Sequence, residues 1–120
     1  MNAGFQEIVP VLPSANIERD VKWYQDNVGF QLLSADTMYA ILKRDHLIIH
    51  LQWHADTPDD PLLGGSVVRI FVKDIHPVFN EFVKRGTVAS DRLRMGTDWG
   101  TNEFGFYDPN NNAIFIVQDA

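Results

Sequence analysis

The chain has 120 residues, of which 45% are hydrophobic, enough for one domain with a substantial core. The absence of cysteine excludes disulfides, thiolate metal sites and cysteine nucleophiles, and we expect a cytoplasmic protein. A net charge of −6 argues against a nucleic-acid partner and favours a cationic or neutral small molecule as ligand. No apolar run reaches the ~18 residues of a membrane span.

The first half of the chain predicts a strand, a helix and three further strands. Residues 7–12 form an apolar run, and Asn16 or Ser14 can cap a helix over residues 17–27. Gly29 is placed to end that helix in a left-handed conformation. Short runs rich in β-branched and aromatic residues then predict strands at 30–35, 38–44 and 46–54.

The second half repeats this order after an acidic, Pro- and Gly-rich connector at residues 55–65, which we interpret as a linker or a flap. Near the end of this half, a turn of Asp, Pro and three Asn at residues 108–112 lies between two apolar runs and is typical of a β-hairpin. The expected elements are a strand, a helix that begins near Ile75 and ends at Gly86, a short strand and the hairpin strands, with the strands at 67–72, 87–90, 104–107 and 113–117.

The two halves match one another at an offset of 57 or 58 residues, for example Tyr24 with Phe82 and Gly29 with Gly86. We therefore expect an α+β fold in which two βαβββ modules form curved mixed sheets around a cup, with the helices on the outer faces. The modules would span about residues 5–54 and 66–118 of a single domain, 1–120, joined by the linker. Because the inner faces need cover, we expect a homodimer, with modules paired within or between chains.

Alternation along two strands selects residues for the inner faces of the cup. In the strand at 46–54, His50 and Gln52 share one face, opposite the apolar positions that would contact a helix. In the strand at 67–72, Arg69 and Phe71 share the corresponding face. These four side chains are candidates for ligand binding.

Arg69 needs a partner there, because an unpaired guanidinium inside a protein is costly. Glu103 or an acid group of a ligand could supply it, and a purely structural ion pair is an equally good interpretation. Trp99 lies in a loop-like sequence, which favours the wall of a binding groove over a core position. Phe115 would form an apolar floor on which a flat ligand could stack.

Short motifs keep a consistent order and spacing along residues 7–117: Pro10-Val11-Leu12-Pro13-Ser14, Trp23-Tyr24, Val28-Gly29-Phe30, Trp99-Gly100-Thr101, Glu103-Phe104 and Asp108-Pro109. Together they resemble the motifs of bleomycin resistance proteins, which belong to the vicinal oxygen chelate, or glyoxalase/bleomycin-resistance/dioxygenase, superfamily. The turn of three asparagines at 110–112 departs from the Asp-Gly-Asn type of sequence usual in that family.

The resemblance also bears on metal binding, since enzymes of this superfamily hold a divalent ion on the inner faces of their modules. The matching positions are Val9, His50, Val67 and Phe115, of which only His50 can ligate a metal. His46 and His54 flank His50, but residues four apart in a strand lie ~13 Å from one another. We therefore expect neither a metal nor a cofactor.

The sequence thus predicts a protein that sequesters an aromatic or glycopeptide-type antibiotic, of which bleomycin is the leading candidate, in the groove of a dimer without chemistry. The expected ligand-binding residues are His50, Gln52, Arg69, Phe71, Trp99, Glu103 and Phe115, and none is expected to be catalytic. Two alternatives remain open. One is an enzyme of the same superfamily, of lyase, isomerase or dioxygenase type, with a displaced or absent metal site; the other is a structural or regulatory module whose cup is filled by side chains.

Overall fold

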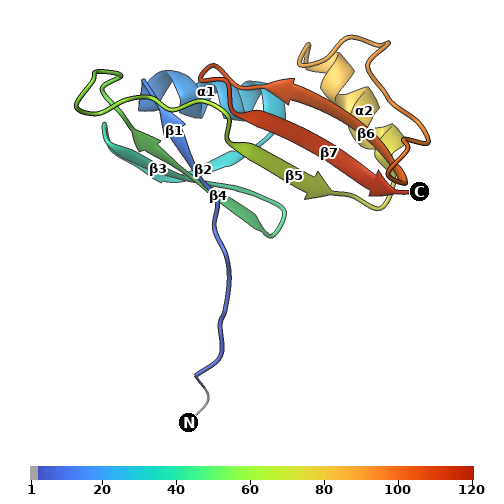
Figure 1. Ribbon diagram of the computed structural model, residues 1–120, viewed down its shortest axis with the longest axis horizontal. Coiled ribbons are helices and arrows are strands. Elements are labelled where there is room, and N and C mark those ends of the chain that lie inside the picture. Colours follow the sequence, from blue (N-terminus) through green and yellow to red (C-terminus); the bar gives the residue numbers. More distant parts are fainter. Residues whose placement is uncertain (1–2) are drawn as a thin grey trace.

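The computed structural model describes residues 3–120 and contains two helices and seven strands in that range (Figure 1). In chain order these are β1 (Val11–Ser14), α1 (Ile17–Val28), β2 (Gln31–Ala35), β3 (Tyr39–Arg44), β4 (Leu47–Trp53), β5 (Val67–Phe71), α2 (Ile75–Lys84), β6 (Thr101–Tyr107) and β7 (Ala113–Asp119). Neither helix is long and apolar enough to cross a membrane.

Both helices begin at the capping residues that their sequences supply. The side chain of Asn16 accepts a hydrogen bond from the backbone N–H of Arg19 at 3.0 Å, and that of Asp74 accepts one from His76 at 3.2 Å. These bonds satisfy donors that the first turn of a helix leaves free. Gly29 ends α1 with a φ of 74°, the left-handed conformation predicted for it.

The strands form two separate sheets, with the orders β1-β4-β3-β2 and β5-β7-β6. Each sheet has one parallel pair at its edge, and Val11 pairs with His50 in the first sheet as Val67 pairs with Ala113 in the second. The remaining pairs are antiparallel. The result is the expected α+β fold of curved mixed sheets with helices on their outer faces.

Two predicted strands differ from the structure. The first strand runs over Val11–Ser14 rather than residues 7–12, because the ladder with β4 begins at Pro10, whose carbonyl accepts from the N–H of His50 at 2.9 Å. Residues 3–8 form an extended, exposed arm that leads away from both sheets (Figure 1). Proline can accept but not donate in a ladder, so it suits the start of a strand.

The strand predicted at 87–90 is absent, which leaves the second sheet with three strands rather than four. Thr87 instead bonds to carbonyl groups near the ends of both helices. Its N–H donates to the carbonyl of Phe82 in α2 at 3.0 Å, and its hydroxyl donates to the carbonyl of Asn27 in α1 at 2.6 Å. The segment between α2 and β6 pairs with β6 through one isolated bridge, Arg94 with Glu103. The prediction of a strand from the β-branched residues of 87–90 is therefore wrong.

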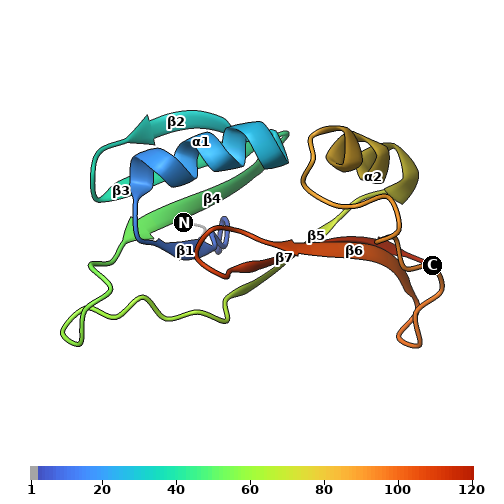
Figure 2. The same cartoon turned by 90° about the horizontal axis from the view of Figure 1, so that it is seen from above.

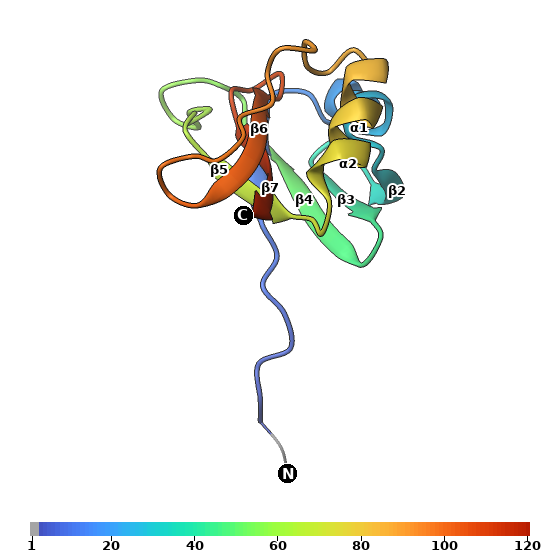
Figure 3. The same cartoon turned by 90° about the vertical axis from the view of Figure 1, so that its right-hand side faces the viewer.

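The helices α1 and α2 lie on the same side of the two sheets, which stand side by side along the long axis of the molecule (Figure 2). The hydrophobic core fills the space between helices and sheets and includes the fully buried Tyr24, Phe82 and Phe104. Seen end-on, neither helix covers the opposite face of the sheets (Figure 3). We call this helix-free side the open face.

Polar contacts join the two halves of the chain. Arg44, at the end of β3, makes two hydrogen bonds of 2.8 and 2.7 Å to Glu81 on α2, and it also donates to the carbonyl of Val28 at 2.8 Å. Arg85 donates to Glu81 at 2.7 Å and to the carbonyl of Asp26 at 3.1 Å. Because α1 has no basic residue in its last turn, these two arginines satisfy its terminal carbonyls from elsewhere in the fold.

A second link is buried. The hydroxyl of Tyr24 on α1 donates to Asp108, in the turn between β6 and β7, at 2.5 Å, and Asn112 of the same turn donates to Asp108 at 2.6 Å and to the carbonyl of Pro13 at 3.1 Å. Asn110 donates to the buried Asp20 at 2.6 Å. The asparagine turn of the second half is thus fixed in the polar interior of the first half.

Candidate functional site

The open face of the second sheet carries most of the predicted site residues, because alternation directs them away from α2. Strand pairing places Arg69 beside Phe115 and Gly105 in one row, and Phe71 beside Val117 and Glu103 in the next. Phe71 is 57% exposed and Trp99, in the loop before β6, is 56% exposed. We call Phe71, Trp99 and Phe115 the aromatic cluster.

Glu103 lies at the base of this site and is almost fully buried. Its Oε1 accepts hydrogen bonds from the Thr101 hydroxyl at 2.5 Å and from the Trp99 indole N–H at 2.7 Å. Burial alone would raise the pKa of Glu103, but these bonds and the Arg69 guanidinium outweigh it and hold the pKa below its usual value. The ionised carboxylate therefore fixes the orientation of Trp99.

Arg69 connects the carboxylate to the aromatic rings. Its guanidinium contacts the two Glu103 oxygens at 3.3 and 3.4 Å and lies over the rings of Phe71 and Phe115, 5.9 and 5.7 Å from their centroids. Its side chain remains 37% exposed. The predicted pairing of Arg69 with Glu103 is present, and the pair borders the aromatic cluster.

Phe115 depends on the absence of a side chain at Gly105. A Cβ built on Gly105 would come within 2.6 Å of the Phe115 ring, closer than two carbon atoms can approach without displacement. Glycine at this strand position thus allows the ring to lie flat on the neighbouring strand β6. No sequence pattern indicates this role of Gly105.

Sequence reasoning also missed Arg94. Its guanidinium lies 5.0 Å from the centroid of the Trp99 ring, within cation–π range. The backbone bridge between Arg94 and Glu103 brings it there, with N–H···O distances of 2.9 Å in both directions. No local sequence pattern predicts a bridge between this irregular segment and β6.

His50 and Gln52 lie on the open face of the first sheet, on the side predicted by alternation. They do not contact the aromatic cluster of the same chain. Instead, the Nδ1 of His50 is 2.7 Å from the hydroxyl of Tyr39, on the neighbouring strand. The structure therefore brings together five of the seven predicted residues and leaves these two apart.

The positions that correspond to metal ligands do not form a chelating set. Val9, Val67 and Phe115 have no side-chain lone pair, and His54 is paired with Asp60 at 2.7 Å. Within residues 3–120, no group of three or more His, Asp or Glu side chains is arranged to hold an ion. The donor set thus does not fit the divalent metal of the superfamily's enzymes.

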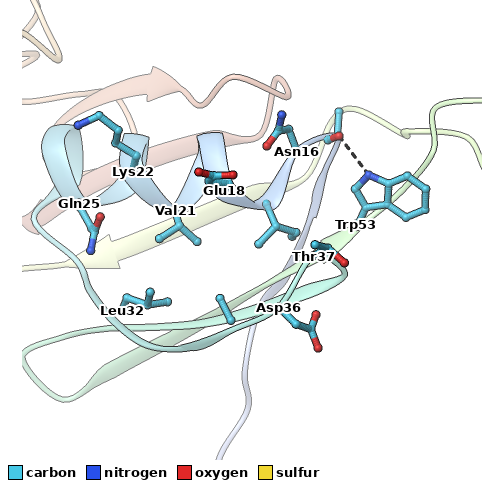
Figure 4. A pocket seen from close by; sticks show the side chains of 12 residues that line it. Asn16, Glu18, Val21, Lys22, Gln25, Leu32, Asp36, Thr37 and Trp53 are labelled. Atoms are coloured by element: carbon cyan, nitrogen blue, oxygen red, sulfur yellow. Dashed lines mark hydrogen bonds between the residues drawn. The ribbon is translucent and has the colours of Figure 1, made fainter.

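Cavities border the open face and also occur elsewhere. One of about 390 Å³ lies where the N-terminal arm passes Arg69 and Phe71, and one of about 660 Å³ lies beside Gly105 and Phe115. A third, of about 710 Å³, lies between α1 and β2 (Figure 4). Its lining includes the charged Glu18, Lys22 and Asp36 and a single aromatic residue, Trp53, so it lacks the concentration of aromatic groups found on the open face.

Comparisons with known proteins agree with this geometry. No family model matches the chain. The bleomycin resistance protein of Geobacillus stearothermophilus is 25% identical over 124 residues, covering 92% of this chain and 94% of that protein.

Solved structures show the same fold. A bleomycin-binding protein complexed with bleomycin has a TM-score of 0.77 at 20% identity, covering 97% of this chain and 100% of that chain. A glyoxalase/bleomycin resistance protein/dioxygenase from Nocardioides has a TM-score of 0.77 at 15% identity, covering 99% of this chain and 86% of that chain. The chain is therefore a homologue of bleomycin resistance proteins and has the fold of bleomycin-binding proteins.

Proposed function

We propose that this protein binds an aromatic or glycopeptide-type antibiotic, such as bleomycin, on the open face and sequesters it without a covalent step, in the cytoplasm. The observation that carries the proposal is the aromatic cluster, three rings around one ion pair on a sheet face that no helix covers, in a homologue of bleomycin resistance proteins. Aromatic groups with a fixed polar partner are typical of sites for flat ligands.

We further propose that a second copy of the chain covers the open face. The accessible surface is 7770 Å², whereas a compact monomer of 13.7 kDa exposes about 6,600 Å². The radius of gyration, 15.5 Å, likewise exceeds the roughly 13.6 Å of a compact chain of this length. An excess of about 1,200 Å², to which the extended arm contributes, is larger than the roughly 800 Å² that one partner buries in a standard interface.

This pairing would complete the site. Since the two sheets of one chain lie side by side, the first sheet cannot face the second sheet of the same chain. Pairing between chains would place His50 and Gln52 of one protomer opposite the aromatic cluster of its partner. All seven predicted residues would then line one groove.

Titration with bleomycin, followed by tryptophan emission, tests the proposed ligand. Trp99 emission should change, and Trp99→Ala should abolish the change and weaken binding by roughly 2- to 12-fold per lost stacking contact. Trp23→Phe is the control, because Trp23 lies on α1 and packs on Tyr24 and Phe106 against the core, so its replacement should leave the response intact. The proposal fails if bleomycin produces no change, or if Trp99→Ala binds as well as the wild type.

Light scattering tests the dimer. A dimer has a mass of about 27 kDa, twice the 13.7 kDa of the chain. Val67→Lys should produce a monomer, because Val67 is 60% exposed on the open face, while Leu33→Lys, at a 54% exposed position of the edge strand β2, should not. A wild-type mass of 14 kDa at micromolar concentration would contradict the proposal.

A further inference from the structure

Two guanidinium groups flank the aromatic cluster. Arg69 lies over Phe71 and Phe115, and Arg94 lies over Trp99. The chain as a whole carries a net charge of −6. The open face of the second sheet therefore presents two guanidinium groups, one of them paired with Glu103, within an acidic protein.

The donors of Arg69 are only partly used. Its two contacts with Glu103, at 3.3 and 3.4 Å, exceed the 2.7–2.9 Å typical of charge-assisted hydrogen bonds. Glu103 instead accepts shorter bonds from Thr101 and Trp99, at 2.5 and 2.7 Å. Arg69 can thus offer N–H groups to a second acceptor without leaving Glu103 buried and unpaired.

Arg94 is positioned by its backbone rather than by an ion pair. Its backbone is hydrogen-bonded to Glu103 in both directions, and its exposed side chain forms no salt bridge with any residue of 3–120. Asp98, the acidic residue next to Trp99 in the chain, pairs with neither arginine. The guanidinium of Arg94, which lies over the indole ring, is therefore available to an anion beside it.

We propose that Arg69 and Arg94 bind an acidic group, such as a carboxylate, attached to the planar ring of the ligand. The ring stacks on the aromatic cluster, and the guanidinium groups receive the anion at its edge. This inference goes beyond the proposed function: it gives the aromatic cluster a second class of ligand, a flat aromatic acid, in addition to the antibiotic. The net charge of the chain, taken alone, favours a cationic ligand and gives no indication of this preference for an acid.

Three probes with the same ring test the proposal: naphthalene-2-carboxylate, naphthalene-2-carboxamide and naphthalen-2-ylmethylammonium. The carboxylate should bind on the order of tenfold more tightly than the amide, since hydrogen bonds to charged groups are the stronger ones. The ammonium probe should bind most weakly. The preference for the carboxylate should decline as salt screens the guanidinium groups.

Arg69→Gln and Arg94→Gln should each reduce carboxylate affinity toward that of the amide, with less than a twofold change for the amide itself. Lys22→Gln is the control for net charge, because Lys22 lies on α1 and pairs with Asp26 away from the open face. Equal binding of carboxylate and amide, or equal losses for both probes in the arginine variants, would overturn the inference but leave the aromatic site standing. Failure of all three probes to bind would contradict both the inference and the proposed site.

Discussion

Replacing Tyr24 by Phe tests whether the buried polar link between the two halves stabilises the fold. The change removes one hydroxyl and keeps the ring, which packs beside Trp23 and Phe30 at centroid distances of 5.0 and 6.1 Å. The lost bond is the 2.5 Å contact with Asp108, which is 4% exposed. Burial and the nearby Asp108 charge raise the pKa of Tyr24, so the hydroxyl keeps its proton and donates at any physiological pH.

The expected loss follows from the remaining partners of Asp108. Asn112 and two backbone N–H groups still donate to it, at 2.6, 2.8 and 3.0 Å, so the carboxylate keeps three of its four donors. A hydrogen bond to a charged group contributes about 1.5–3 kcal/mol. For a chain of this length about 1 kcal/mol corresponds to roughly 4 °C, so Tm should fall by about 6–12 °C.

Thermal unfolding followed by circular dichroism, at one fixed protein concentration, measures this shift. Tyr107→Phe is the matched control, since Tyr107 is 69% exposed and forms no side-chain hydrogen bond within residues 3–120. Its Tm should change by no more than about 2 °C. If Tyr24→Phe lowered Tm no further than Tyr107→Phe does, the buried link would not contribute to stability.

Three further outcomes are expected. Gly105→Ala should displace the Phe115 ring and weaken bleomycin binding several-fold in the fluorescence titration while the protein stays folded; unchanged affinity would show that the ring does not contact the ligand. Asn16→Ala should destabilise the protein by about 1 kcal/mol in urea unfolding, and Asn16→Asp, which keeps the cap, should restore most of it. Hydrogen bonds from Arg44 and Arg85 hold the pKa of Glu81 in the folded protein below the usual 4.5. The contribution of Glu81 to folding stability is therefore complete above pH 4.5 and is lost as the pH falls through the lower pKa of the folded state. The Tm difference between wild type and Glu81→Gln should therefore narrow in acid, and a gap that widens below pH 4.5 would contradict this.

Local sequence patterns were sufficient to predict most elements and the faces of their side chains. The two-residue period of β4 and β5 placed His50, Gln52 and Arg69 on the helix-free side, and the structure agrees, because a strand directs alternate side chains to opposite faces wherever it lies. The caps at Asn16 and Gly29 followed from backbone chemistry that depends only on neighbouring residues. The same reasoning failed at 87–90, where contacts with Phe82 and Asn27 replace the strand.

Only the tertiary structure decided how these faces combine. The two sheets stand side by side, which leaves His50 away from the aromatic cluster. A bridge between the irregular segment after α2 and strand β6 places Arg94 over Trp99. The turn at 108–112 is polar and looks exposed in sequence, yet it docks on Tyr24, 84 residues away in the chain. Periodicity and capping act within a few residues, whereas these contacts depend on which distant surfaces meet, so the sequence of either segment alone carries no sign of them.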